Sequence, residues 1–199
     1  MPNTIKNINS LDFSKRYTYA DYLNWHFKER VELIKGWIHK MSPAPRRYHQ
    51  KVSFNLTLEL GNWFDNNECE MYTAPFDVRL QKNKGDSDDN IETVVQPDLS
   101  VICDKSKLDD RGCLGAPDLI VEILSPSTAK KDFNDKYYLY QENGVKEYWI
   151  VNPDGKSVNI FVLVNNIYQE HSYFEDAKGI IKSPTFSELE IECQVIFKD

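Results

Sequence analysis

The chain has 199 residues, of which 41% are hydrophobic and 13% aromatic, and its formal net charge is −7. This apolar content favours a folded domain with a buried core over a disordered chain. No apolar run approaches the length of a membrane span, which argues against an integral membrane protein. The negative charge argues against a general nucleic-acid coat protein, because phosphate contacts supply much of that affinity, but it is compatible with an enzyme that has one basic cleft.

Two features bear on the cellular compartment. The N-terminal residues MPNTIKNINSLDFSKR contain no apolar stretch of the kind that a secretory signal needs. The four cysteines are widely spaced and none forms a Cys-x-x-Cys pair, so the sequence favours neither a zinc site nor a disulfide framework. We therefore expect a cytoplasmic protein with reduced cysteines.

The N-terminal part predicts an arm and the start of a domain. Residues 1–17 are polar and are expected to form a flexible arm, with a single domain over residues 18–199. Thr18 and Asp21 have the spacing of a capping box, which predicts a short helix that continues to about Arg30.

A hairpin and a long helix are predicted next. Apolar residues on both sides of Lys35-Gly36 predict a hairpin over residues 31–41, which Ser42-Pro43-Ala44-Pro45 ends. From Tyr48 to Phe64 apolar residues recur at helical spacing, so this segment is expected to be an amphipathic helix.

The rest of the chain predicts strands and one more helix. Strands are expected at 71–80, 94–103, 118–124 and 147–151, and a hairpin at 158–164 and 167–173, with polar loops at 82–92 and 104–115. Ser127 or Thr128 is placed to cap a helix that ends at Gly144. The order is then helix, three strands, helix, strand. This order predicts an α/β fold whose central strand, 118–124, is covered on both faces.

Two acids in these strands suggest a cation site. Glu122 is the one carboxylate in the apolar run Leu119–Leu124, where an ionised group is costly unless it is paired, hydrogen-bonded or bound to a metal. Asp98 lies near the start of the preceding predicted strand. If the two strands are neighbours, both carboxylates would converge on one Mg²⁺ ion, which typically takes one or two carboxylates and keeps several waters.

A lysine on the following helix is the third candidate. Lys136 falls near Tyr140 on the helical wheel, at the edge of the apolar stripe, so its ammonium would reach over the strand that carries Glu122. There it would orient a water or stabilise charge on a phosphate. The competing interpretations are a structural ion pair between Glu122 and Lys136, a turn-capping role for Asp98, and a solvated surface position for Lys136.

Several stretches together resemble a known family. They are Glu32-Leu33-Ile34-Lys35-Gly36, Met41-Ser42-Pro43, His49, Gln96-Pro97-Asp98, residues 115–128 (GAPDLIVEILSPST), Asp132, Lys136, Tyr140 and Glu147-Tyr148-Trp149. They are similar to the Uma-two family of restriction endonuclease-like proteins in the PD-(D/E)XK nuclease superfamily, over roughly residues 18–165. The resemblance implies a restriction-endonuclease-like core, a mixed sheet flanked by helices, with extra N- and C-terminal hairpin strands.

The resemblance also implies a site and a chemistry. Asp98 and Glu122 would hold Mg²⁺ or Mn²⁺, and the protein would be an endonuclease that hydrolyses nucleic acid, with DNA as the expected substrate. The superfamily pattern places a lysine at position 124, where this chain has Leu124, and the family relocates it to the next helix, which matches Lys136. The family often has a glutamate where this chain has Trp37.

His49 and the basic residues near it have two interpretations each. The family match makes His49 a candidate site residue that contacts phosphate or water, whereas a lone histidine at a helix start is more often a polar group of the helix end. Arg46, Arg47 and Lys51, like Lys130 and Lys131, would be either solvated or in contact with a nucleic-acid backbone. Asp118 is at least as suited to a hydrogen-bonding role as to metal ligation.

Two other classes of function compete with the enzyme. A catalytically inactive module of the same fold would bind nucleic acid or a protein partner, and is suggested by the net charge, Trp37 and Leu124. A self-associating protein is suggested by aromatic residues around positions 137–149, and a homodimer would suit cleavage of both strands of a duplex.

Overall fold

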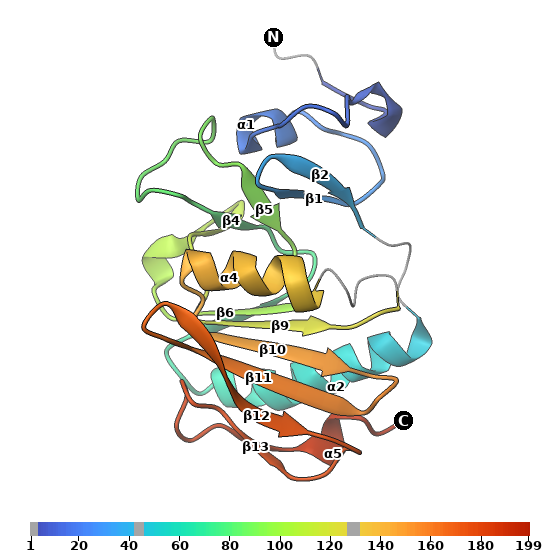
Figure 1. The fold of residues 1–199 in the computed structure, drawn as a ribbon, viewed down its shortest axis with the longest axis vertical. Helices are drawn as coiled ribbons and strands as arrows, with labels where there is room; N and C mark the ends of the chain where they lie inside the picture. Colours follow the sequence, from blue (N-terminus) through green and yellow to red (C-terminus); the bar gives the residue numbers. More distant parts are fainter. Residues whose placement is uncertain (1–3, 42–45, 127–131) are drawn as a thin grey trace.

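A computed structural model of the chain describes residues 4–41, 46–126 and 132–199. Within these residues the strands form two six-stranded sheets and one two-stranded sheet. Figure 1 shows the sheet that contains the N-terminal strands above the sheet that carries the longer, C-terminal strands. We call these the N-terminal sheet and the core sheet.

The core sheet has the strand order β12-β11-β10-β9-β6-β3. β9 and β10 are parallel, and every other neighbouring pair in this sheet is antiparallel. The strands are β3 (Glu70–Thr73), β6 (Leu99–Ile102), β9 (Leu119–Ile123), β10 (Glu147–Asn152), β11 (Ser157–Val164) and β12 (Ile167–Phe174).

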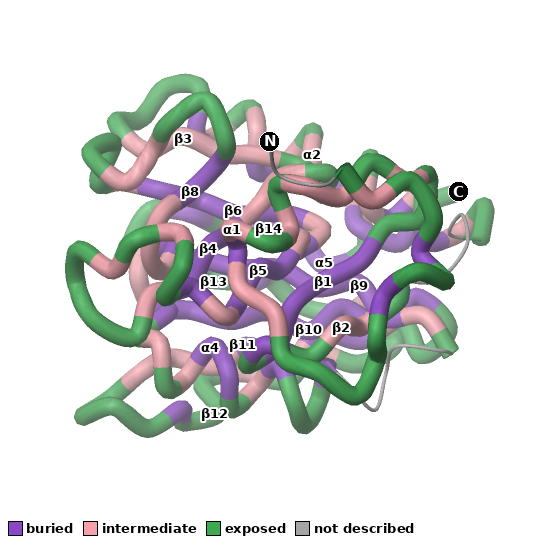
Figure 2. Tube along the Cα trace, turned by 90° about the horizontal axis from the view of Figure 1, so that it is seen from above, coloured by how far each residue is buried: buried purple, intermediate pink, exposed green. Residues whose placement is uncertain are grey.

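Helices cover both faces of this sheet, as predicted for its central strand. α2 (Arg47–Phe64) lies behind the sheet in Figure 1, and α4 (Tyr137–Asn143) lies in front of it. On β9 the side chains alternate, so Leu119, Val121 and Ile123 pack toward α2, whereas Ile120 packs toward α4. In Figure 2 the buried part of the trace follows the strands, and the exposed part follows the outer loops. The predicted helix and the predicted buried strand are therefore confirmed.

The N-terminal sheet has the order β2-β1-β5-β4-β8-β7. Its strands are β1 (Val31–Ile34), β2 (Trp37–Lys40), β4 (Val78–Leu80), β5 (Thr93–Val95), β7 (Leu108–Asp109) and β8 (Gly112–Leu114). The predicted hairpin is confirmed as β1–β2. Lys35 and Gly36 both have positive φ, 51° and 84°, which is the backbone of a two-residue turn that follows the twist of the strands.

Two predicted strands are each divided between the sheets. The segment 71–80 forms β3 in the core sheet and β4 in the N-terminal sheet, and 94–103 forms β5 and β6 in the same two sheets. Pro75 and Pro97 lie at the two crossings. Proline has no N–H to donate to a ladder, so each proline ends strand pairing where the chain changes sheet.

The described part of the predicted arm, residues 4–17, makes packing contacts, although a flexible segment was expected. Ile8, in the short 3-10 helix η1 (Ile8–Ser10), and Leu11 are buried with Val31 of the hairpin, and Ile5 pairs with Trp25. Their apolar side chains anchor a segment that is otherwise polar. The helix predicted from Thr18 to about residue 30 is only α1 (Tyr19–Tyr22), although its capping box is present. The loop predicted at 104–115 contains η2 (Lys105–Lys107), β7 and β8.

The cysteines also correct the sequence analysis, because Cys69 and Cys103 form a disulfide. They lie 34 positions apart in sequence but flank β3 and β6, whose register pairs Glu70 with Ile102. Strand pairing therefore brings together two cysteines whose spacing gave no sign of it. Cys113 and Cys193 are free and buried.

The helix after β9 ends where predicted. A π-helical turn, η3 (Asp132–Lys136), leads into α4, and Gly144 follows with φ 81°, the left-handed conformation that glycine adopts without strain. The predicted caps, Ser127 and Thr128, lie outside the described residues, as does the break at 42–45. The chain ends in β13 (Ile180–Lys182), β14 (Glu190–Glu192) and α5 (Cys193–Ile196). None of the described helices is long and apolar enough to cross a membrane.

Candidate active site at the end of strand β9

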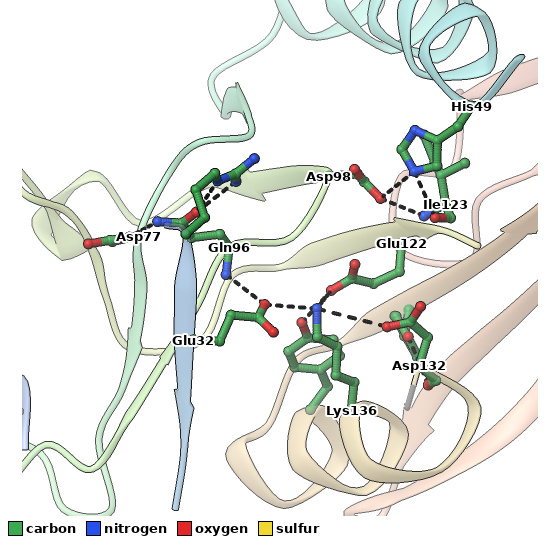
Figure 3. Close-up of polar contacts among 12 residues, drawn as sticks. Glu32, His49, Asp77, Gln96, Asp98, Glu122, Ile123, Asp132 and Lys136 are labelled. Carbon is green, nitrogen blue, oxygen red and sulfur yellow. Dashed lines mark hydrogen bonds and ion pairs between the residues drawn. The ribbon is translucent and has the colours of Figure 1, made fainter. Parts of the chain in front are cut away.

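The two candidate acids lie on neighbouring strands. β6 and β9 are antiparallel and pair Leu99 with Val121, so the next positions along the ladder are Asp98 and Glu122. Both carboxylates can approach one ion only if these strands are neighbours, and this predicted pairing is confirmed. Figure 3 shows the resulting arrangement at the end of β9.

Glu122 is a buried carboxylate with two donors on one oxygen. Its Oε1 accepts hydrogen bonds from Lys136 Nζ at 2.6 Å and from the Tyr140 hydroxyl at 2.7 Å. Burial raises the pKa of Glu122 to about 8, and the nearby acids Asp132, Asp98 and Glu32 add to this effect, while Lys136 opposes it. The positive charge of Lys136 is therefore too small to offset the effects of burial and of the nearby acids on the pKa of Glu122.

Lys136 is the centre of a buried charge cluster. It is 4% exposed, which rules out the solvated surface position. Besides its contact with Glu122, Lys136 Nζ lies 2.9 Å from Glu32 Oε1 and 3.9 Å from Asp132 Oδ1. Burial opposes the charge of the ammonium, but the three carboxylates outweigh it, so the pKa of Lys136 lies well above 10.5. The lysine therefore remains a cation.

Position 124 explains why the lysine comes from the helix. Leu124 is buried and packs in the apolar cluster that includes Leu139 and Tyr140 of α4. A charged side chain at position 124 would lose this packing. Lys136 instead reaches Glu122 from η3, the helical turn that leads into α4. A lysine from the helical segment after β9 therefore lies beside Glu122, as the sequence resemblance implied.

Asp98 and His49 form a second group on the main chain of β9. Asp98 Oδ2 accepts a hydrogen bond from the Ile123 N–H at 2.8 Å, and His49 Nε2 lies 2.9 Å from the Ile123 carbonyl and 3.6 Å from Asp98 Oδ2. Burial lowers the pKa of His49, but its contacts with Asp98 and Ile123 more than offset this, and the pKa lies above 6.5. The histidine at the start of α2 is thus directed into the site.

Two buried acids of the cluster were not among the predicted site residues. Glu32, on β1, is 1% exposed, and Asp132, in η3, is 2% exposed. The signal for Glu32 was available, because it stands between Val31 and Leu33 in an apolar strand just as Glu122 does in β9. Asp132 lies four residues before Lys136, a spacing that places both on one side of a helical turn.

Other candidates lie outside this cluster. Asp118 accepts a hydrogen bond from the Cys103 N–H at 2.8 Å and pairs with Lys146 at 2.6 Å, which is the hydrogen-bonding role. Arg46 and Arg47 are exposed at the start of α2, two or three residues from His49. Lys130 and Lys131 lie outside the described residues, and Trp37 is 44% exposed on β2.

The site carries more negative than positive charge, and its donors suit a hard cation. Four carboxylates, Glu32, Asp98, Glu122 and Asp132, face Lys136 and His49. In the described part of the chain no three His, Cys, Asp or Glu side chains converge as a closed metal site. Asp98 and Glu122 nevertheless offer the two carboxylates with which Mg²⁺ is typically bound, and water and phosphate oxygens complete its shell.

Comparisons with known proteins identify the family of the chain. The model of the family described as "Uma2: Putative restriction endonuclease" matches residues 19–194. Two uncharacterized proteins of Synechocystis sp. are similar in sequence: slr1290 is 26% identical over 144 residues (71% of each chain), and sll1609 is 30% identical over 132 residues (64% of this chain and 70% of that one).

A solved structure shares the fold. The crystal structure of "a putative nuclease belonging to DUF820" from Anabaena variabilis superposes with a TM-score of 0.68 at 20% identity, over 91% of this chain and 97% of that one. This confirms the restriction-endonuclease-like fold. With the family match over nearly the whole chain, we conclude that the protein belongs to the Uma2 family.

Proposed function

We propose that this protein is a metal-dependent endonuclease that hydrolyses phosphodiester bonds in DNA. The family description and the nuclease fold support a nuclease. The observation that carries the proposal is the pair of carboxylates on adjacent strands, Asp98 and Glu122, with a buried ammonium 2.6 Å from the second. Metal dependence and the choice of DNA go beyond the family description.

Each residue has a role that follows from its position. Asp98 and Glu122 would hold Mg²⁺ or Mn²⁺, which lowers the pKa of a bound water and neutralises charge on the phosphate. Lys136 stays protonated beside Glu122, so it supplies a fixed positive charge for the transition state or orients the attacking water. His49, at the Ile123 carbonyl, is placed to contact a water or phosphate oxygen on the opposite side of Asp98 from Lys136.

Calorimetric titration of Mn²⁺ into the wild type and into Asp98→Asn/Glu122→Gln tests the metal site. We expect binding by the wild type alone, because the double variant keeps the shapes of both side chains and loses both charges. Glu147→Gln is the matched control, since Glu147 is a buried glutamate on the neighbouring strand whose hydrogen bonds lie outside this site. The control should bind Mn²⁺ as the wild type does.

Cleavage assays then test the activity. Plasmid DNA, single-stranded DNA and RNA are each incubated with protein and Mg²⁺ or Mn²⁺, and the double variant should lose at least about 100-fold of any activity. If the wild type binds no Mn²⁺ even with an oligonucleotide present and cleaves none of these substrates, the proposal fails. Oligonucleotide binding without cleavage would instead indicate an inactive nucleic-acid-binding module of the same fold.

A further inference from the structure

Glu32 comes from a different sheet than Glu122, its partner on the other side of Lys136. It lies on β1 of the N-terminal sheet, whereas Glu122 lies on β9 of the core sheet. Its Oε1 nevertheless lies 2.9 Å from Lys136 Nζ, and the side chain is 1% exposed. Figure 3 shows the Lys136 ammonium between the carboxylates of Glu32 and Glu122. The N-terminal sheet therefore contributes a charged group to the candidate active site.

The same carboxylate holds the turn that carries Asp98. The Gln96 N–H donates to Glu32 Oε1 at 3.1 Å, and Gln96 precedes Asp98 by two residues. The Gln96 side chain is fixed in turn, since its Oε1 accepts from Arg30 Nε at 2.9 Å and its Nε2 donates to Asp77 Oδ1 at 2.7 Å. The same oxygen, Glu32 Oε1, therefore contacts Lys136 Nζ and also accepts from the main chain two residues before Asp98.

Neutralisation of Lys136 does not require Glu32. Glu122 and Asp132 already place carboxyl groups 2.6 Å and 3.9 Å from the ammonium, so Glu32 adds a third acid to a cluster that has too few cations. Burying an additional carboxylate costs free energy that a well-packed apolar side chain would avoid. A lysine side chain is long and flexible, and two carboxylates on separate elements restrict its ammonium to one place. The arrangement favours precise placement of the charge over stability.

We propose that Glu32 is a positioning residue that fixes the Lys136 ammonium, so that the N-terminal sheet completes the active site. The inference rests on the proposed function of that site. Misplacement of a catalytic group by about 1 Å can cost about 100-fold in rate. Glu32→Gln keeps the shape of the side chain and removes its charge. We expect it to lower kcat by about 10- to 100-fold while KM for DNA changes less than about 3-fold.

A double-mutant cycle separates action through Lys136 from an independent effect. Glu32→Gln is compared with wild type, and Glu32→Gln/Lys136→Met with Lys136→Met. If Glu32 acts through the lysine, its substitution should matter little, less than about 2-fold in kcat, once the lysine is gone. An equal loss in both backgrounds overturns the proposal, as does wild-type kcat in Glu32→Gln. Glu147→Gln, which alters a buried glutamate away from the site, should leave kcat unchanged.

A measurement on the ammonium itself does not depend on activity or metal. In ¹⁵N-labelled protein, the Lys136 NH₃⁺ group, assigned by its absence in Lys136→Arg, should exchange its protons slowly in the wild type. We expect exchange at least about 10-fold faster in Glu32→Gln and unchanged exchange in Glu147→Gln. Unchanged exchange in Glu32→Gln overturns the proposal even if kcat falls. If the wild type cleaves nothing, the proposed function fails and the exchange rates alone decide whether Glu32 holds the lysine.

Discussion

Glu122 and Glu147 are buried glutamates on neighbouring parallel strands, β9 and β10, and their surroundings differ in kind. Glu147 is surrounded by neutral donors: Trp149 Nε1, the Ser183 hydroxyl at 2.7 Å and the Thr185 N–H at 3.0 Å. Glu122 has a cation and a tyrosine hydroxyl, with three other acids nearby. The two residues face opposite sides of the core sheet, because Glu147 shares its face with Trp149 and Glu122 faces α4.

The difference separates a structural carboxylate from a candidate functional one. Glu147 ties the C-terminal segment around Ser183 to the core sheet, and its three donors satisfy one charge without introducing others. The cluster around Glu122 holds more charge than it can neutralise. Such a cluster costs stability, and strongly perturbed groups in a site are typical of function. Burial of an acid alone is therefore a weaker sign of function than the balance of charge around it.

Lys136→Met tests whether the cluster around Glu122 depends on its lysine for stability. The substitution keeps much of the side-chain volume but leaves Glu122, Glu32 and Asp132 buried without their shared cation. We expect the free energy of unfolding to fall by about 3–5 kcal/mol, the usual cost of removing one partner of a buried pair. Urea denaturation at pH 7 measures this loss.

The same substitution at an exposed lysine provides the control. Lys182 pairs with Glu190 at 2.7 Å and the two side chains are 65% and 49% exposed, so Lys182→Met should cost less than about 1 kcal/mol. Equal losses at the two lysines would show that the buried cluster does not depend on Lys136 for its charge balance.

Much of the fold was predictable because it depends on local pattern. The hairpin β1–β2, helix α2 and strands β9 and β10 follow apolar periodicity and turn residues that lie within the element itself. The division of 71–80 and 94–103 between two sheets was not predicted, since a proline marks an end of pairing and not the sheet that the chain enters next. The disulfide depends on the pairing of β3 with β6, which the cysteine spacing does not encode.

The same distinction between local pattern and long-range contact applies to the candidate active site. Glu122 and Lys136 could be placed together from one strand and the helix after it, since their separation in sequence is short. The contact between Glu32 and Lys136 joins the two sheets and spans about half the chain, and no local pattern reports such a contact. The apolar context of Glu32 predicted burial but not its partner.

Glutamine substitutions at Glu122 and Glu147 test the difference between the two carboxyl groups directly. In Glu147→Gln the new amide N–H₂ replaces an oxygen that accepts from donors, so one or more of them loses its partner. We expect a loss of about 1–3 kcal/mol of unfolding free energy. Burial and the acidic neighbours keep Glu122 largely protonated at pH 7, so Glu122→Gln replaces one neutral side chain with another of the same shape. It should therefore cost less than Glu147→Gln in metal-free buffer at pH 7. Denaturant titrations with EDTA compare the two, and a larger loss for Glu122→Gln would contradict this account.

A pH dependence that belongs to Glu122 alone is also expected. Its pKa is raised from 4.5 to about 8 in the folded protein, mainly by burial. Between these values the folded protein holds a proton that the unfolded chain has lost, so a rise in pH favours unfolding. We therefore expect the stability of the wild type, relative to Glu122→Gln, to fall from about pH 5 to pH 8 and then to level off. The slope should not exceed about 1.4 kcal/mol per pH unit, the value for one proton.

Urea denaturation of both proteins in EDTA at several pH values measures the difference, and subtraction removes the titration of groups that they share. A difference that stays constant or rises over this range would mean that Glu122 is already ionised in the folded protein at pH 5. The Lys136 ammonium and the Tyr140 hydroxyl would then outweigh the burial of the carboxylate and the repulsion from its acidic neighbours.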